Sequence, residues 1–166
     1  MHNQLTPGDI KKMQEEIEYR KLVVRKEALE DGKEARAQGD LSENFEYYAA
    51  KKFKNKNESR IRYLERMIRT AEIISEESGE DEVGMNNGVE VFFEEDGETE
   101  TYKIVTTVRQ NSLEGLISSE SPLGKALLGH KAGERIFVDL GGGNGYHVVI
   151  RSIDKTTDGD DALRSF

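Results

Sequence analysis

Apolar residues recur at spacings of three and four in the first half of the chain, which is typical of helices that bury one narrow face. Thr6 and Pro7 suit the start of the first helix and Gly39 suits its end. We therefore predict helices over residues 7–38 and 41–78, which pair through a short connection as an antiparallel coiled coil. The two apolar series are Ile10, Met13, Ile17, Val24, Ala28 and Ala35, and Phe45, Ala49, Phe53, Ile61, Leu64, Ile68 and Ala71.

The spacing changes to two after a turn-rich, acidic segment at residues 79–88. Ser121 and Pro122 suit the N-cap and first position of a short helix that ends at Gly129. The polar residues 157–166 are expected to fray. The alternation predicts strands over residues 89–94, 101–108, 113–118, 135–140 and 145–153.

These elements predict an α+β chain of two domains. Residues 1–79 are expected to form the antiparallel coiled-coil hairpin. Residues 80–166 are expected to form a compact antiparallel sheet with one short helix.

Charge is distributed unevenly along the chain. The net charge is −9, and residues 80–166 carry all of it, because residues 1–79 hold equal numbers of acidic and basic side chains. Acidic residues predominate over residues 27–46 and basic residues over 51–69. The acidic total argues against a general binder of duplex DNA, whereas the basic stripe is compatible with contact to one nucleic-acid strand. The alternative for the stripe is a solvated helix face with i,i+4 ion pairs such as Glu58–Arg62 and Glu65–Arg69.

Composition excludes several other classes. The chain has no Cys, so disulfides and Cys-built zinc sites are excluded, and its three His residues stand in unrelated settings. No apolar run approaches the roughly 20 residues that span a bilayer. The N-terminus lacks the features of a signal peptide, so we expect a cytoplasmic location and no membrane association.

Two carboxylates, Asp40 and Glu43, fall at the break between the two predicted helices. They fit a capping box, with Asp40 as N-cap and Glu43 three residues later. Their place at the end of a long arm also suits carboxylates presented to a partner, and one role does not exclude the other. The nearby aromatic side chains Phe45, Tyr47, Tyr48 and Phe53 are expected in the core of the hairpin, with base stacking as the alternative.

Two blocks of sequence resemble one known family. Residues 34–47, EARAQGDLSENFEY, are similar to the coiled-coil tip of the bacterial GreA/GreB transcript-cleavage factors. Residues 116–133, LISSESPLGKALLGHKAG, resemble the C-terminal signature of that family in its GreA-type form. The resemblance extends from about Thr6 to Asp154. Phe45 stands where the family often has a small residue, and the basic stripe is denser than in typical GreA-type members, so the length of RNA released stays open.

The resemblance implies a second domain with a fold like that of FK506-binding proteins, and a monomer whose tip enters the secondary channel of RNA polymerase. Asp40 and Glu43 would bind a Mg²⁺ ion in the polymerase active site, with Ser42 and Asn44 orienting them or the attacking water. The chain would then stimulate cleavage of backtracked RNA without being an enzyme or holding a cofactor alone. The implied contacts are Lys51, Lys52, Lys54, Lys56 and Arg60 for the RNA 3′ end, and Ser121, Pro122, Leu123 and Lys125 for docking on polymerase.

Two other hypotheses remain at this point. In the first hypothesis, the chain is a binding regulator that fills the same channel and does not promote cleavage. In the second, it is a coiled-coil adaptor unrelated to polymerase. Replacement of Asp40 and Glu43 without loss of effect would favour the regulator, and dimerisation through the apolar seam without binding to polymerase would favour the adaptor.

Overall fold

The computed structural model describes residues 3–37 and 43–165. The chain divides into two compact units. One unit consists of residues 9–71, and the other combines residues 3–8 with the chain from residue 72 onward. Each unit has its own buried side chains.

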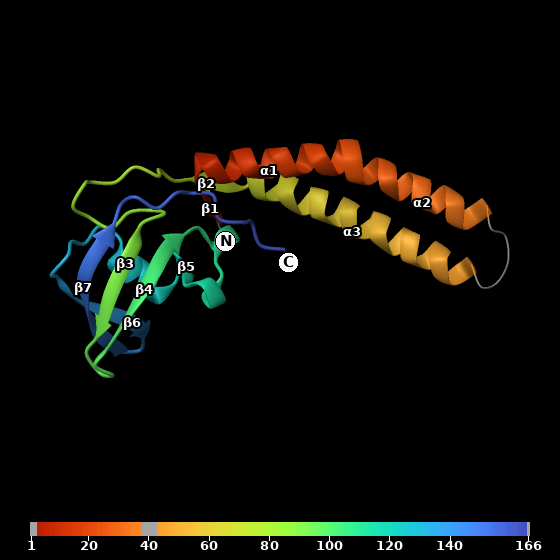
Figure 1. Cartoon of the computed structure of the whole chain (residues 1–166). Helices are drawn as coiled ribbons and strands as arrows, with labels where there is room; N and C mark the ends of the chain where they lie inside the picture. The colour runs from red at the N-terminus through yellow and green to blue at the C-terminus, as the bar shows by residue number, and fades with distance from the viewer. Residues whose placement is uncertain (1–2, 38–42, 166) are drawn as a thin grey trace. The chain divides into compact units, whose positions relative to one another are not determined.

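The first unit is a helical hairpin, as predicted (Figure 1). One arm consists of α1 (Pro7–Tyr19), a π-helical turn η1 (Arg20–Val24) and α2 (Arg25–Ala37), and the other arm is α3 (Glu43–Arg69). At about 1.5 Å per residue, the 27 residues of α3 span about 40 Å. None of the described helices is long and apolar enough to cross a membrane. The buried apolar seam contains Met13, Ala28, Ile61, Leu64 and Met67.

Two features of the hairpin differ from the prediction. The second helix ends at Arg69 rather than near residue 78, because the chain continues as strand β2 (Ala71–Ile73), which pairs with β1 (Asn3–Leu5). The amide of Ile74 donates to the carbonyl of Leu5 at 2.9 Å, and Leu5 is fully buried. The π-helical turn in the first arm is the second difference, since a continuous α-helix was predicted.

The second unit is built on a five-stranded sheet in the order β5-β4-β3-β7-β6. The β4–β5 pair is parallel and the other pairs are antiparallel, so the sheet is mixed rather than wholly antiparallel. Val89, Val91, Ile104 and Ile150 from the sheet pack in one core with Leu127 of the short helix. The elements are β3 (Gly88–Phe93), β4 (Glu98–Val105), β5 (Leu116–Ser118), α4 (Pro122–Leu127), β6 (Arg135–Gly141) and β7 (Asn144–Asp154).

The segment after β7 was predicted to fray, and this prediction is wrong. Arg109 is 4% exposed, and its guanidinium donates to the carbonyl oxygens of Gly159 and Asp161. The amide of Arg164 donates to the carbonyl of Val108 at 2.7 Å. A buried guanidinium needs acceptors, and the polar segment supplies them from its backbone.

Candidate functional site

The two predicted tip carboxylates fall where the hairpin arms are joined. α2 ends at Ala37 and α3 begins at Glu43 (Figure 1), and in the sequence Asp40 and Ser42 fall between these two residues. Asp40 and Ser42 lie outside the described residues. Glu43 and Asn44 are the first two residues of α3, and their side chains also lie outside what the structure describes. The metal-binding and capping hypotheses for Asp40 and Glu43 therefore stay predictions.

Four lysines of the basic stripe are exposed on α3. Glu58 and Glu65, which could have neutralised the stripe along its own helix, instead form ion pairs with the first arm. Glu58 binds Arg25 at 2.9 Å and Glu65 binds Lys21 at 2.8 Å. This pairing differs from the i,i+4 pairs considered from the sequence, and it leaves the stripe basic. The exposed lysines are Lys51, Lys52, Lys54 and Lys56.

A groove of about 270 Å³ lies between α2 and α3 beside this stripe. Lys51 and Lys54 line it together with Lys33, Tyr47 and Gly32. A Cβ atom added at Gly32 would meet no atom within 4 Å, so the missing side chain helps to open the groove. Ammonium groups beside an aromatic ring are a combination suited to a phosphate and a base. The sequence pattern singled out the lysines of α3 but not Lys33 or Gly32, because a lone glycine inside a helical pattern indicates only a weaker helix.

Arg60 was predicted to contact RNA, and the structure places it elsewhere. Its side chain is 8% exposed and lies in the seam between the arms. Its Nε atom donates to Glu16 Oε2 at 2.8 Å, and Nη2 donates to Glu16 Oε1 at 3.3 Å. Because a guanidinium buried in this way is committed to the carboxylate, Arg60 belongs to the packing of the hairpin and not to a nucleic-acid surface.

The aromatic residues near the start of α3 also differ from the prediction. They were expected in the hairpin core, but Phe45 is 81% exposed, Tyr48 is 62% exposed and Phe53 is 42% exposed. Tyr47 is half-buried, and its ring meets that of Tyr48 edge to face with centroids 5.7 Å apart. Exposed rings on a basic helix are available to stack on bases.

The predicted docking residues surround the N-terminus of α4. The hydroxyl of Ser121 accepts from the amide of Gly124 at 3.1 Å and donates to the carbonyl of Ser118 at 2.6 Å, so Ser121 caps the helix. Leu123 packs against the core, whereas Pro122 and Lys125 are exposed. Of the four predicted docking residues, Pro122 and Lys125 are therefore the exposed ones, and docking by them stays a prediction.

Hydrogen bonds connect the residues on either side of α4. The hydroxyl of Thr107 lies 2.6 Å from that of Ser118 and donates to Glu120 Oε2 at 2.8 Å. At the other end, the backbone amide of Lys131 and the ring of His130 hold the pKa of the Glu134 carboxyl below its ordinary value. The residues on both sides of α4 are thus hydrogen-bonded to their own neighbours.

The sequence missed one exposed apolar residue of this unit. Leu113 was predicted to begin a strand, but it lies in a 3₁₀ turn (Ser112–Glu114) and is 97% exposed. The side chain of Asn111 caps that turn by accepting from the amide of Leu113 at 3.2 Å. The Asn-Ser pair before Leu113 is a turn signal that the strand prediction overlooked.

Metal ligands do not gather elsewhere in the part of the chain that the structure describes. Within residues 3–37 and 43–165, no group of three or more His, Asp or Glu side chains could hold a metal ion. Asp40 and Glu43 are two carboxylates, and two are fewer than the oxygen ligands a Mg²⁺ ion takes, so water, phosphate or a partner would have to complete the shell.

Comparison with known proteins assigns both units to one family. Residues 3–73 match the model for the N-terminal domain of transcription elongation factors, and residues 77–155 match the model for the C-terminal domain of GreA/GreB. The chain is 44% identical to transcription elongation factor GreA of Bacillus subtilis over 139 residues, which cover 84% of this chain and 88% of that protein. It is 46% identical to GreA of Geobacillus kaustophilus over 140 residues, 84% of this chain and 89% of that protein. The sequence of GreA factor homolog 1 from Thermus thermophilus, whose crystal structure is known, is 28% identical to this chain. The structural match has a TM-score of 0.42 and covers 92% of this chain and 99% of that one.

Proposed function

The chain belongs to the GreA/GreB family of transcription elongation factors, and we propose that it stimulates RNA polymerase to cleave backtracked RNA. It is a transcription elongation factor of the GreA type. The observation that carries the cleavage proposal is the place of Asp40 and Glu43. Both carboxylates belong to the stretch that joins the arms of the hairpin or directly follows it, in a chain whose two units both match the family.

Cleavage of a phosphodiester by two metal ions requires one ion to generate hydroxide and one to stabilise the leaving oxygen. In this proposal the polymerase holds one Mg²⁺ firmly, and Asp40 and Glu43 supply carboxylate oxygens to the second. Mg²⁺ is commonly bound through one or two carboxylates, with water and phosphate completing its shell. Ser42 and Asn44 orient these carboxylates or the attacking water. The chain on its own is then neither an enzyme nor a holder of a cofactor.

The remaining surfaces serve binding in the same proposal. The hairpin enters the secondary channel, and the exposed lysines of α3 bind phosphates of the extruded RNA 3′ end, with exposed Phe45 and Tyr48 available for stacking. Pro122 and Lys125 contact the polymerase surface from α4, whose N-terminus Ser121 caps. The factor works as a monomer in the cytoplasm, where it meets the polymerase.

The test uses stalled, backtracked elongation complexes that carry 3′-end-labelled RNA, with Mg²⁺ present. Asp40→Asn and Glu43→Gln remove one negative charge each and keep the size of the side chain. We expect the wild-type chain to release short 3′ fragments, and each variant to bind polymerase with unchanged affinity while cleavage slows by about 100-fold or more.

Binding without cleavage by the wild-type chain would overturn the proposal. The chain would then be a regulator that occupies the channel, and the carboxylates would be helix caps. Circular dichroism of each variant serves as the control, because loss of a cap would lower helix content whereas loss of a metal ligand would not.

A further inference from the structure

The π-helical turn η1 changes how the first arm faces the second. The backbone N–H of Arg25 donates to the carbonyl of Arg20, a span of five residues instead of the four of an α-helix. A π turn therefore accommodates one additional residue. Each additional residue rotates the helix beyond it by about 100° and moves it by about 1.5 Å along the axis. The position of η1 thus determines which face α2 turns toward α3.

Both ends of this turn are bonded to consecutive residues of α3. Asn57 Nδ2 donates to the carbonyl of Arg20 at 3.3 Å, and Arg20 Nη1 donates to Asn57 Oδ1 at 3.0 Å. Arg25, at the other end, donates from Nη2 to Glu58 Oε1 at 2.9 Å and from Nε to Glu58 Oε2 at 3.2 Å. Asn57 is 3% exposed, so its reciprocal bonds with Arg20 form inside the hairpin.

A carboxylate completes this polar layer. Glu16 accepts from Arg20 Nε at 2.8 Å and from Arg60 Nε at 2.8 Å. Further along α3 the seam continues with two buried aliphatic side chains, Ile61 one turn and Leu64 two turns beyond Asn57. A buried polar side chain in a coiled coil lowers stability but selects one register, because every other register leaves its polar atoms unsatisfied.

We propose that Asn57 and Arg20 are positioning residues for the tip. By holding η1 at one place, they fix the rotation and height of α2 against α3. α2 ends at Ala37 and α3 begins at Glu43, so this Asn57–Arg20 lock sets how the two helix ends that flank the segment with Asp40 lie relative to each other. This inference rests on the proposed function. An amide suits the task because it offers one donor for the carbonyl and one acceptor for the guanidinium.

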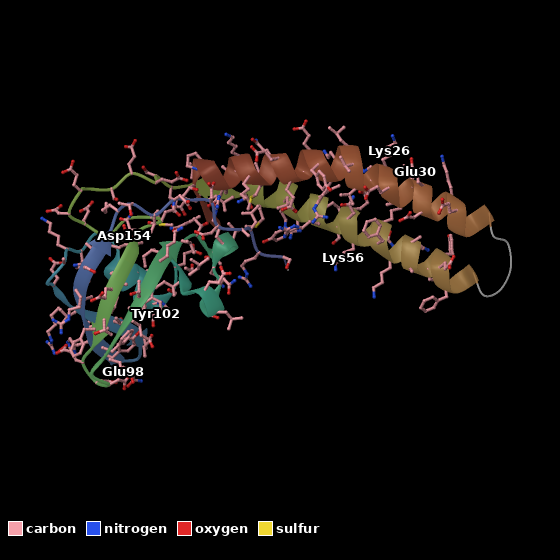
Figure 2. All side chains as sticks on the ribbon, in the orientation of Figure 1. Lys26, Glu30, Lys56, Glu98, Tyr102 and Asp154 are labelled. Carbon is pink, nitrogen blue, oxygen red and sulfur yellow. The ribbon has the colours of Figure 1, made fainter. Side chains whose placement is uncertain are left out.

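The first measurement tests whether Asn57 and Arg20 fix the position of α2 against α3. The chain has no Cys, so a pair of cysteines at Lys26 and Lys56 can carry spin labels on α2 and α3 (Figure 2). Both sites are exposed, and Lys26 lies beyond η1. We expect one narrow distance distribution for the full chain, and a shifted or broadened one after Asn57→Leu. Ser59→Leu, the same kind of change at an exposed position two residues away, is expected to leave the distribution unchanged.

The second measurement tests positioning in the cleavage assay, with unlabelled protein. We expect Asn57→Leu to lower the cleavage rate at saturating factor by about tenfold or more, because small displacements of catalytic groups are costly. The concentration for half-maximal cleavage is expected to change less than the rate, since the α4 segment and the exposed lysines of α3 are all retained. Asn57→Gln keeps one amide donor and one acceptor and is expected to recover part of the rate. Should Asn57→Leu lose its helix content, Arg20→Met takes its place in both measurements.

Three outcomes would count against these ideas, and they are distinguishable. If Asn57→Leu had the wild-type distance distribution and the wild-type cleavage rate at saturating factor, Asn57 would not hold η1 in place. A shifted distribution with a full rate would overturn the positioning role. Failure of the wild-type chain to stimulate cleavage would overturn the proposed function, and the distance measurement would still decide whether Asn57 holds η1.

Discussion

At the scale of single residues, Glu16 links the stability of the hairpin to pH. Burial raises the pKa of its carboxyl, but the hydrogen bonds and charges of Arg60 and Arg20 outweigh burial and bring the pKa below the ordinary value of 4.5. Its contribution to stability is therefore complete above about pH 4.5 and is lost as the pH falls through the lowered pKa of the folded state. We expect Glu16→Gln to lower the free energy of unfolding of the hairpin by about 2 kcal/mol at neutral pH.

Denaturant titrations followed by helical circular dichroism check this expectation. Glu18→Gln, an exposed position on the same helix, is the matched control and is expected to have little effect. The difference between wild type and Glu16→Gln should shrink in acid, because protonation removes the same charge from the wild-type chain. Equal stability at neutral pH, or a difference that persists in acid, would contradict the assigned role.

Residue burial could be predicted only where it follows from local pattern. Ile61 and Leu64 lie at helical spacing and are buried as expected. Arg60 looked like one more base in an exposed stripe, because its partner Glu16 lies 44 positions away in the chain. The prediction that Phe45 and Tyr48 are buried was wrong for the opposite reason. An aromatic ring suggests a core position, and nothing in the neighbouring sequence shows that these two rings lie outside the buried seam.

At the scale of elements, Gly32 weakens α2 without a packing need for glycine. It lies inside the helix, and an added Cβ would meet no atom within 4 Å. We expect Gly32→Ala to raise the free energy of unfolding of the hairpin by about 1 kcal/mol, because alanine has the higher helix propensity. Thermal unfolding of the helical signal measures the change. An unchanged or lower stability would show that α2 needs glycine at this position.

Gly124 is the matched counterpart for this substitution. It lies in α4, where an added Cβ would approach the carbonyl oxygen of Ser118 to 2.1 Å. The same change to alanine must therefore displace backbone, and we expect it to destabilise the second unit. The two glycines illustrate that helix propensity determines the effect of a glycine-to-alanine change on stability only where the added Cβ has open space.

Helices and strands could be predicted where a hydrophobic period is sustained over many residues. The predictions were wrong where an element depends on contacts with a segment far away in the sequence. The arms of the hairpin and the five strands follow from spacings of 3.6 and 2. Residues 71–73 kept the helical rhythm, yet they form β2 because β1, far away in sequence, pairs with them. The π turn at Arg20–Val24 carries no sequence signature, since its anchors Asn57 and Glu58 belong to the other arm.

At the scale of the whole molecule, the site could be located from sequence because it is a local motif between two regular helices. Asp40 and Glu43 fall where the arms meet, whatever the details of packing. The groove and the polar layer could not be located in this way, because each requires both arms to be folded against each other. The same limit applies to the segment after β7, whose anchor Arg109 lies about 50 residues earlier.

Charge distribution leads to the last expectation at this scale. The net charge of −9 lies in residues 80–166, so attraction to RNA has to come from the local stripe on α3. We expect the double change Lys51→Gln and Lys54→Gln, both in the groove, to weaken cleavage at limiting factor. The dependence of binding on salt should become shallower by about 0.7 in the log–log slope for each RNA phosphate that a lysine no longer neutralises. The matched control is Lys11→Gln with Lys26→Gln, which removes the same charge from exposed positions on the first arm. If both double variants behaved alike, net charge rather than phosphate binding would explain the effect, and the stripe on α3 would be an ordinary solvated helix face.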